Sequence, residues 1–247
     1  MKISIVGAGQ VGGQAAFLIA SAGLGDVVLF DTKPGLAQGK ALDIGQSLVL
    51  MSGSAAVTGG TDWRLTACSN IVVITAGLAR RPGMTRQDLL SANAAIVCSV
   101  VREAVHWSPD AIIVVVTNPI NTMTYLSYKV SEVDSRRVIG MAGLLDNARF
   151  SYFLAKELSV AREEIESWVI GDHGEHLVPI LSQAYMAGRR CIDQVPISQI
   201  KELCERTRNA GTEILNYLRD GSAYFAPGAA ICRTIKAITQ NENAALS

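Results

Sequence analysis

The chain has 247 residues, of which 49% are hydrophobic and 18% charged, and its 22 basic residues balance 22 acidic ones. This composition indicates a compact globular protein of one large or two small domains and excludes disordered and fibrous classes. The chain has no net basic charge, and its longest fully apolar runs, such as residues 111–116, are far too short to cross a bilayer, so we expect neither a nucleic-acid nor a membrane partner.

Short runs rich in β-branched residues alternate with longer helical stretches over the first 140 residues. The runs occupy residues 3–6, 27–31, 56–58, 71–75, 112–116 and 138–140. Most are apolar at every position, as in strands that are covered on both faces. This alternation predicts an α/β fold with a doubly wound parallel sheet of the Rossmann type.

The first run leads into a glycine-rich turn and a helical stretch over residues 14–22. The turn reads Gly7-Ala8-Gly9-Gln10-Val11-Gly12, a GxGxxG pattern. The first glycine permits a tight turn, the second lets a pyrophosphate approach the backbone, and the third lets the helix pack on the strand. The glycines alone are a weak signal, because turns use glycine for many reasons.

Asp31 strengthens that signal, because it stands nineteen residues beyond Gly12 at the end of the second run. A carboxylate there can accept hydrogen bonds from the adenosine ribose and would repel a 2′-phosphate, which favours NAD over NADP. The alternative is an ordinary helix-capping aspartate. The strand, glycines, helix and acidic residue together favour an NAD site.

Residues 75–77 end the fourth run at the place where a doubly wound sheet reverses its strand order, the usual position of a ligand. Arg80, Arg81 and Arg86 follow around a Pro-Gly turn, on a loop that could close as a lid. By itself, such a cluster is as often a solvated surface. Asn118, after the fifth run, could bond a substrate oxygen or cap the helix that follows Pro119.

After about residue 143 helical stretches dominate, and we expect a dinucleotide-binding domain over 1–143 and an α+β substrate domain over 144–247. In the second, residues 168–171, 177–181 and 184–188 indicate an antiparallel hairpin region. A helix with apolar residues on one face follows, with Ser198 available as its N-cap.

Three polar residues in the second domain are candidates for a site of acid–base chemistry. His173 lies between Gly171 and Gly174, which can expose its side chain. Asp146 and Arg149 are spaced i and i+3 and share a helix face; an ordinary surface pair would have the same spacing. Of the other histidines, His106 at a helix end reads as structural.

Five cysteines, an odd number without a CxxC pair, favour reduced thiols in a cytoplasmic protein over a disulfide framework or a metal site. Met1 leads directly into the first strand, without the features of a secretory signal.

Six segments together resemble the malate dehydrogenases of the lactate-dehydrogenase-like group. They are residues 7–12, 74–78, 80–86, 116–119, 140–143 and 145–149. The likeness runs in register from Met1 to about residue 237. It implies an NAD-dependent enzyme that interconverts malate and oxaloacetate, small dicarboxylates, and that forms a homodimer or homotetramer, for which the apolar helix around residues 41–44 is suited.

The same resemblance assigns roles to individual residues. It implies that His173 exchanges the substrate hydroxyl proton, that Asp146 orients His173, and that Arg86 polarises the C2 oxygen. It implies that Asn118 bonds that oxygen, that Arg149 holds the C1 carboxylate and that Arg80 meets the C4 carboxylate, with Arg81 in solvent. The implied coenzyme-binding residues are Gly7, Ala8, Gly9, Gln10, Val11, Gly12, Asp31, Thr75, Ala76, Gly77, Asn93, Val116 and Asn118.

The sequence departs from the family pattern at two places. Glu175 and His176 follow the His-Gly pair, where the family has an aspartate, so the proton shuttle has a rival in His176. We favour His173 because it alone lies between glycines. Family chains also continue with a further hairpin and a long helix, so we expect the second domain to be C-terminally incomplete.

Three alternatives remain. Tyr125 and Lys129 form the YxxxK spacing of short-chain dehydrogenases, although the glycine spacing differs from that family. The chain could also be a lactate or other 2-hydroxy acid dehydrogenase of the same superfamily. A non-catalytic NAD-binding protein could use the same fold.

Overall fold

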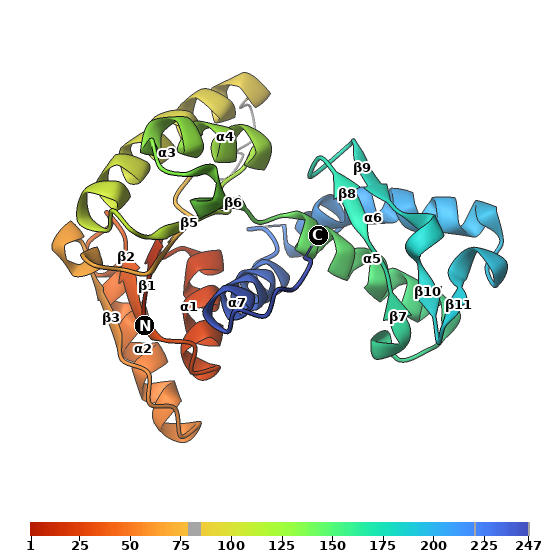
Figure 1. Ribbon diagram of the computed structural model, residues 1–247, viewed down its shortest axis with the longest axis horizontal. Coiled ribbons are helices and arrows are strands. Elements are labelled where there is room, and N and C mark those ends of the chain that lie inside the picture. The colour runs from red at the N-terminus through yellow and green to blue at the C-terminus, as the bar shows by residue number, and fades with distance from the viewer. Residues whose placement is uncertain (79–84, 220, 247) are drawn as a thin grey trace. The chain divides into compact units, whose positions relative to one another are not determined.

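A computed structural model describes residues 1–78, 85–219 and 221–246, with only the backbone of Arg86. The chain divides into two compact units. The first contains Met1–Met141 and Tyr224–Asn243, and the second is formed mainly by Ala142–Ala223. Each is described separately (Figure 1).

The first unit contains the predicted parallel sheet, with all six strands present in the order β3-β2-β1-β4-β5-β6. The strand order reverses between β1 and β4, which both pair with parallel neighbours. The carboxyl ends of these two strands are therefore the expected ligand position. The strands are β1 (Lys2–Val6), β2 (Asp26–Phe30), β3 (Val57–Gly60), β4 (Ile71–Ile74), β5 (Ile112–Val115) and β6 (Val138–Gly140).

Helices cover both faces of this sheet, which explains why its strands are apolar at almost every position. Figure 1 shows α3 and α4 on one side and α1 and α7 on the other. Ile3, Ile5, Leu29 and Ile74 are fully buried between the layers. The helices are α1 (Gln10–Ser21), α2 (Leu36–Leu50), α3 (Arg86–Trp107), α4 (Ile120–Ser131) and α7 (Phe225–Thr239).

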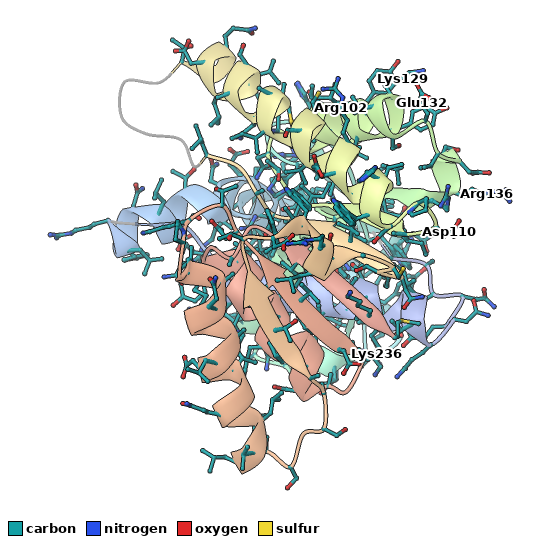
Figure 2. The ribbon with its side chains drawn as sticks, turned by 90° about the vertical axis from the view of Figure 1, so that its left-hand side faces the viewer. Arg102, Asp110, Lys129, Glu132, Arg136 and Lys236 are labelled. Carbon is teal, nitrogen blue, oxygen red and sulfur yellow. The ribbon has the colours of Figure 1, made fainter. Side chains whose placement is uncertain are left out.

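Helix α3 is long and apolar enough, by length and composition alone, to cross a membrane over Gln87–Trp107. It packs against α4 and β4, however, and its Val97 and Val101 are fully buried in the first unit. Figure 2 shows the charged side chains of Arg102 on α3 and Lys129 on α4. These features are typical of an amphipathic helix that packs one face on a globular unit and leaves the other face solvated.

Helix α7 packs against α1 in the first unit, although the sequence placed all residues after 143 in the second domain. A Cβ added at Gly228 of α7 would lie only 2.7 Å from Cγ of Gln14 on α1. Ile231 and Ile235 are fully buried. The two helices can approach closely because a glycine occupies the contact. With α7, the chain returns to its first unit.

The second unit contains α5 (Gly143–Leu158) and α6 (Ile197–Leu218), with short strands on their surface. The predicted hairpin region is present, since β8 (Val169–Gly171) pairs antiparallel with β9 (Leu177–Pro179). A second sheet joins β7 (Ile165–Glu166), β10 (Tyr185–Met186) and β11 (Arg189–Arg190).

Helix α6 begins before the predicted cap. Its N-cap is Pro196, whose carbonyl accepts the first helical hydrogen bond from Ile200 at 3.1 Å, and Ser198 lies inside the helix. The prediction that Ser198 caps this helix was wrong, because proline is well tolerated at the start of a helix, where no N–H partner is needed.

Candidate active site

The glycine loop between β1 and α1 has the geometry that its sequence predicts. Gly7 adopts a φ of 107°, and a Cβ there would lie 2.5 Å from the backbone nitrogen of Ala76. A Cβ at Gly12 would lie 1.9 Å from the carbonyl oxygen of Gly7. The Thr75 hydroxyl donates to that oxygen at 2.8 Å, which ties the loop to the end of β4.

The same loop leaves an open approach to the N-terminus of α1. A Cβ placed at Gly9 would meet nothing within 4 Å, and Gly9 and Gln10 are exposed. Gly9 is the N-cap, and among the described residues no side chain caps the helix or places a carboxylate in its first turn. The first N–H groups are thus available to an anion, as a pyrophosphate requires.

Asp31 lies directly after β2, where two backbone groups fix its carboxylate. Oδ2 accepts the N–H of Ala8 at 2.8 Å, and Oδ1 accepts that of Lys33 at 2.9 Å. An ionised carboxylate offers about four acceptor positions. The remaining positions can accept ribose hydroxyls, so the residues of this unit fit a dinucleotide.

The loops after β4 and β5 are held together by Asn93, which lies on α3 and is 1% exposed. Its Oδ1 accepts the N–H of Leu78 at 2.8 Å, and its Nδ2 donates to the carbonyl of Asn118 at 2.7 Å. The Thr117 hydroxyl adds a bond to the carbonyl of Ala76 at 2.7 Å. Asn93 was expected to bind the coenzyme. In the structure it holds in place the loops after β4 and β5, which contain other predicted coenzyme-binding residues.

Those loops contain the remaining predicted residues of the first unit. Gly77 and Asn118 are exposed, whereas Ala76 and Val116 are partly buried. Pro119, and not Asn118, is the N-cap of α4, so the alternative role of Asn118 as that cap was wrong. The side chain of Asn118 is exposed and available to a ligand.

The predicted arginine loop lies largely outside the described residues. Arg80 and Arg81 are not described, and Arg86 is the first residue of α3 with its side chain undescribed. The helix begins with a capping box between Thr85 and Asp88, which fixes the backbone at Arg86.

Three predicted residues meet in the second unit around one buried carboxylate. His173 Nδ1 lies 2.6 Å from Oδ2 of Asp146, and Arg149 Nη1 lies 3.2 Å from Oδ1. The Asp146 side chain is 4% exposed, while those of His173 and Arg149 are 21% and 13% exposed. A buried charge must be paired, and here it has two partners.

Local structure explains how these side chains meet. Asp146 lies in the first turn of α5, where a carboxylate interacts favourably with the helix dipole. His173 lies in the connection between β8 and β9, which begins at Gly171 with a φ of 92°. A Cβ at Gly171 would lie 2.4 Å from the carbonyl oxygen of His176, so the connection needs glycine there.

The arrangement can perform acid–base chemistry on an anionic substrate. With Nδ1–H donated to Asp146, the Nε2 of His173 can accept a proton from a hydroxyl group. Arg149 uses only Nη1 in its ion pair, and its buried Nε has no partner among the described residues. An unpaired guanidinium N–H that is buried favours a carboxylate ligand.

Two features of this unit were not predicted. On α6, Arg208 donates from Nε to the carbonyl of Leu177 at 3.0 Å, which anchors the end of the histidine connection. Ser167 donates to Oδ1 of Asn147 at 2.8 Å, next to Asp146. No local sequence pattern identifies such bonds, since their partners are distant along the chain.

Among the described residues, no group of three or more His, Cys, Asp or Glu side chains could hold a metal ion. His176, the rival proton shuttle, is exposed, whereas His173 is the histidine that contacts the buried carboxylate.

Comparison with known proteins gives matches over the whole chain. Residues 1–140 match the family model described as lactate/malate dehydrogenase, NAD binding domain, and residues 144–247 match the lactate/malate dehydrogenase alpha/beta C-terminal domain. The chain is 45% identical to the malate dehydrogenases of Desulforudis audaxviator and Bacillus subtilis. These alignments cover 98% and 99% of the chain, and 78% and 79% of those proteins.

Solved structures of such enzymes have the same fold. Apo malate dehydrogenase from Picrophilus torridus superposes with a TM-score of 0.97 at 40% identity, over 99% of this chain and 77% of that one. A lactate dehydrogenase from Cryptosporidium parvum, complexed with lactic acid and nicotinamide adenine dinucleotide, gives a TM-score of 0.95 at 37% identity, over 99% of this chain and 79% of that one.

Proposed function

Because the chain belongs to the lactate/malate dehydrogenase family, we propose that it is an NAD-dependent malate dehydrogenase, which interconverts malate and oxaloacetate. The curated relatives at about 45% identity carry this name. The observation that carries the proposal is the 2.6 Å contact between His173 and the buried Asp146, with Arg149 on the same carboxylate.

In this function the second unit handles the substrate. Arg149 binds the C1 carboxylate with the guanidinium donors that its ion pair leaves unused. His173 takes the C2 hydroxyl proton at Nε2 during malate oxidation and returns it during oxaloacetate reduction. Asp146 keeps the imidazole in the required orientation and stabilises its positive charge after it accepts the proton.

The first unit binds the coenzyme. The N–H groups at the start of α1 meet the pyrophosphate, and Asp31 accepts the adenosine ribose hydroxyls. When bound, NAD supplies the hydride acceptor for C2 of malate. Asn118 and Arg86 complete the set by bonding and polarising the C2 oxygen, roles that are supported by the family resemblance.

A lactate dehydrogenase is the second candidate, since the Cryptosporidium parvum enzyme matches about as well in fold as the malate dehydrogenases do. The two activities differ in the group at the far end of the substrate, a carboxylate in oxaloacetate and a methyl in pyruvate. Arg80, which the resemblance assigns to that carboxylate, favours malate, because a neutral residue would suit a methyl.

Steady-state assays with NADH and either oxaloacetate or pyruvate test the proposal. We expect a strong preference for oxaloacetate, and His173→Asn should lower kcat by roughly 10²- to 10⁴-fold while NADH binding is retained. His176→Asn is the matched control. The proposal fails if both keto acids remain unreduced, or if His176→Asn inactivates the enzyme while His173→Asn does not.

We also propose a cytoplasmic homodimer or homotetramer. Its support is the exposed apolar surface of α2, where Leu42, Val49 and Leu50 are 65%, 78% and 89% exposed. Sedimentation of the purified protein would measure the assembly, and a purely monomeric species would contradict it.

A further inference from the structure

Lys40, which none of the roles above uses, reaches from α2 back to the glycine loop. Its Nζ donates to the carbonyl of Gly9 at 2.7 Å and lies 3.5 Å from Oε1 of Gln10. Partial burial lowers the pKa of Lys40, and the carboxylate of Asp31 acts in the opposite direction. A lysine ammonium therefore lies at the anion-binding end of α1, close enough to Asp31 to interact with it.

Gly13 leaves the space that this lysine occupies. The GxGxxG pattern ends at Gly12, so it gives no reason for a further glycine inside α1. A Cβ at Gly13 would lie 2.9 Å from Nζ and 3.0 Å from Cδ of Lys40. Glycine in a helix interior is less favourable than alanine, and the room that it leaves for the lysine is the compensating structural reason.

The bond from Lys40 controls the direction of one peptide group. The carbonyl of Gly9 also accepts the N–H of Gly13 at 2.9 Å, so two donors hold it. A peptide unit is planar and trans, and its N–H points opposite to its C=O. Fixing the Gly9 carbonyl therefore turns the N–H of Gln10 away from Lys40.

Asp31 holds the preceding part of the same loop. Its Oδ2 accepts the N–H of Ala8 at 2.8 Å, so that Asp31 and Lys40 bond neighbouring groups of the loop, one as acceptor and one as donor. A carboxylate near a pyrophosphate is unfavourable by itself, and the ammonium offsets it.

We propose that Lys40 is a positioning residue for the coenzyme. It fixes the orientation of the Gly9–Gln10 peptide so that the loop N–H groups meet the pyrophosphate, and the absence of a side chain at Gly13 leaves room for the lysine. The proposal rests on the NAD-binding function proposed above. The new element is a residue on α2, which is not part of the GxGxxG motif but contacts the glycine loop.

The first test measures NADH binding to the intact protein by fluorescence titration. Lys40→Ala should raise the Kd by roughly tenfold, since a bond from a charged donor is lost. Lys40→Arg keeps the charge and the donors, and should restore most of the affinity. Lys236→Ala, which removes an exposed lysine from α7, is the charge-matched control and should change the Kd less than twofold.

The second test uses Gly13→Ala, which displaces the end of a flexible side chain and leaves the backbone in place. It should weaken NADH binding about as much as Lys40→Ala does, although alanine favours the helix. The double variant should bind no more weakly than either single variant, because both changes remove one interaction. Gly39→Ala is the control, since a Cβ at Gly39 of α2 meets nothing within 4 Å.

The outcomes separate this inference from the function on which it rests. If the parent protein does not bind NADH, the coenzyme function itself is wrong. If the parent binds NADH but Lys40→Ala binds equally well, or if the effects of Lys40→Ala and Gly13→Ala simply add, the role of Lys40 is overturned and the NAD site remains.

Discussion

In the proposed function, individual side chains determine which coenzyme and which substrate the protein prefers. Two backbone N–H groups hold the carboxylate of Asp31 in a fixed orientation. Asp31→Ser should narrow the preference for NADH over NADPH, because it removes both the ribose acceptor and the repulsion of a 2′-phosphate. The ratio of kcat/KM values for the two coenzymes measures this, and equal use of both by the parent protein would contradict it.

Arg80 carries the substrate choice in the proposed function. Loss of one partner from a buried, hydrogen-bonded charge pair costs about 3 to 5 kcal/mol, and each 1.36 kcal/mol is about tenfold in rate. Arg80→Gln should thus lower kcat/KM for oxaloacetate by roughly two to three powers of ten, and leave pyruvate unchanged or improved. Arg81→Gln is the control. If the ratio of kcat/KM values for oxaloacetate and pyruvate does not change, this loop does not bind the C4 carboxylate.

Functional residues could be predicted from the sequence where they lie close together along the chain. The glycine loop and Asp31 follow from spacing, because the turn and the strand end are contiguous in sequence. Lys40 could not be predicted in this way, since it lies 31 residues from Gly9 and only the packing of α2 brings it there. Asn93 and Arg208 act in the same manner, across 25 and 31 residues.

At the scale of elements, α3 begins at a capping box that adjoins Arg86. Thr85 Oγ1 accepts the N–H of Asp88 at 3.1 Å, and Oδ2 of Asp88 accepts that of Thr85 at 3.0 Å. The Thr85 hydroxyl and then the Thr85 N–H, both donating to this carboxylate, lower the pKa of Asp88. The stability that these bonds contribute is present above the ordinary carboxyl pKa and is lost as the pH falls through the lowered value.

Thr85→Ala should fray this helix start and destabilise the protein by about 1 kcal/mol, the usual cost of losing such a cap. If Arg86 acts on the substrate, KM for oxaloacetate should rise while NADH affinity stays the same. Urea unfolding and steady-state kinetics measure the two effects. Ser91→Ala, at an exposed position inside α3, is the control; an equal effect of both substitutions would argue against the capping box.

The elements themselves were predicted best where their pattern is local and repeated. The six parallel strands were predicted because each contains a short run rich in β-branched residues, and most of these runs are apolar at every position. The two-residue strands β7 and β11 have too few residues for any alternation, and they exist only because they pair with β10. The start of α6 was misplaced because serine favours caps, whereas Pro196 is the N-cap and the helix begins at Ile197.

At the scale of the whole molecule, the chain leaves its first unit after Met141 and returns to it at Tyr224. The sequence could not predict this return, because α7 has an ordinary amphipathic pattern and its partner α1 is more than 200 residues away. The packing of α7 on α1, including the close contact between Gly228 and Gln14, shows where α7 belongs. The stability of the dinucleotide-binding unit thus depends on residues from the far end of the chain.

Ile235 on α7 tests this dependence, because it is fully buried in the first unit. Ile235→Ala should destabilise the protein by about 2 to 5 kcal/mol, through lost burial and the cavity that remains. Amide hydrogen exchange should accelerate in α1 and β1 more than in α5 and α6, because the unit that loses the contact opens locally more often. Lys236→Ala, at the exposed neighbouring position, should change the stability by no more than about 0.5 kcal/mol. Faster exchange confined to α5 and α6 would mean that α7 stabilises the substrate-binding unit instead, and that the return of the chain to the first unit has no energetic consequence.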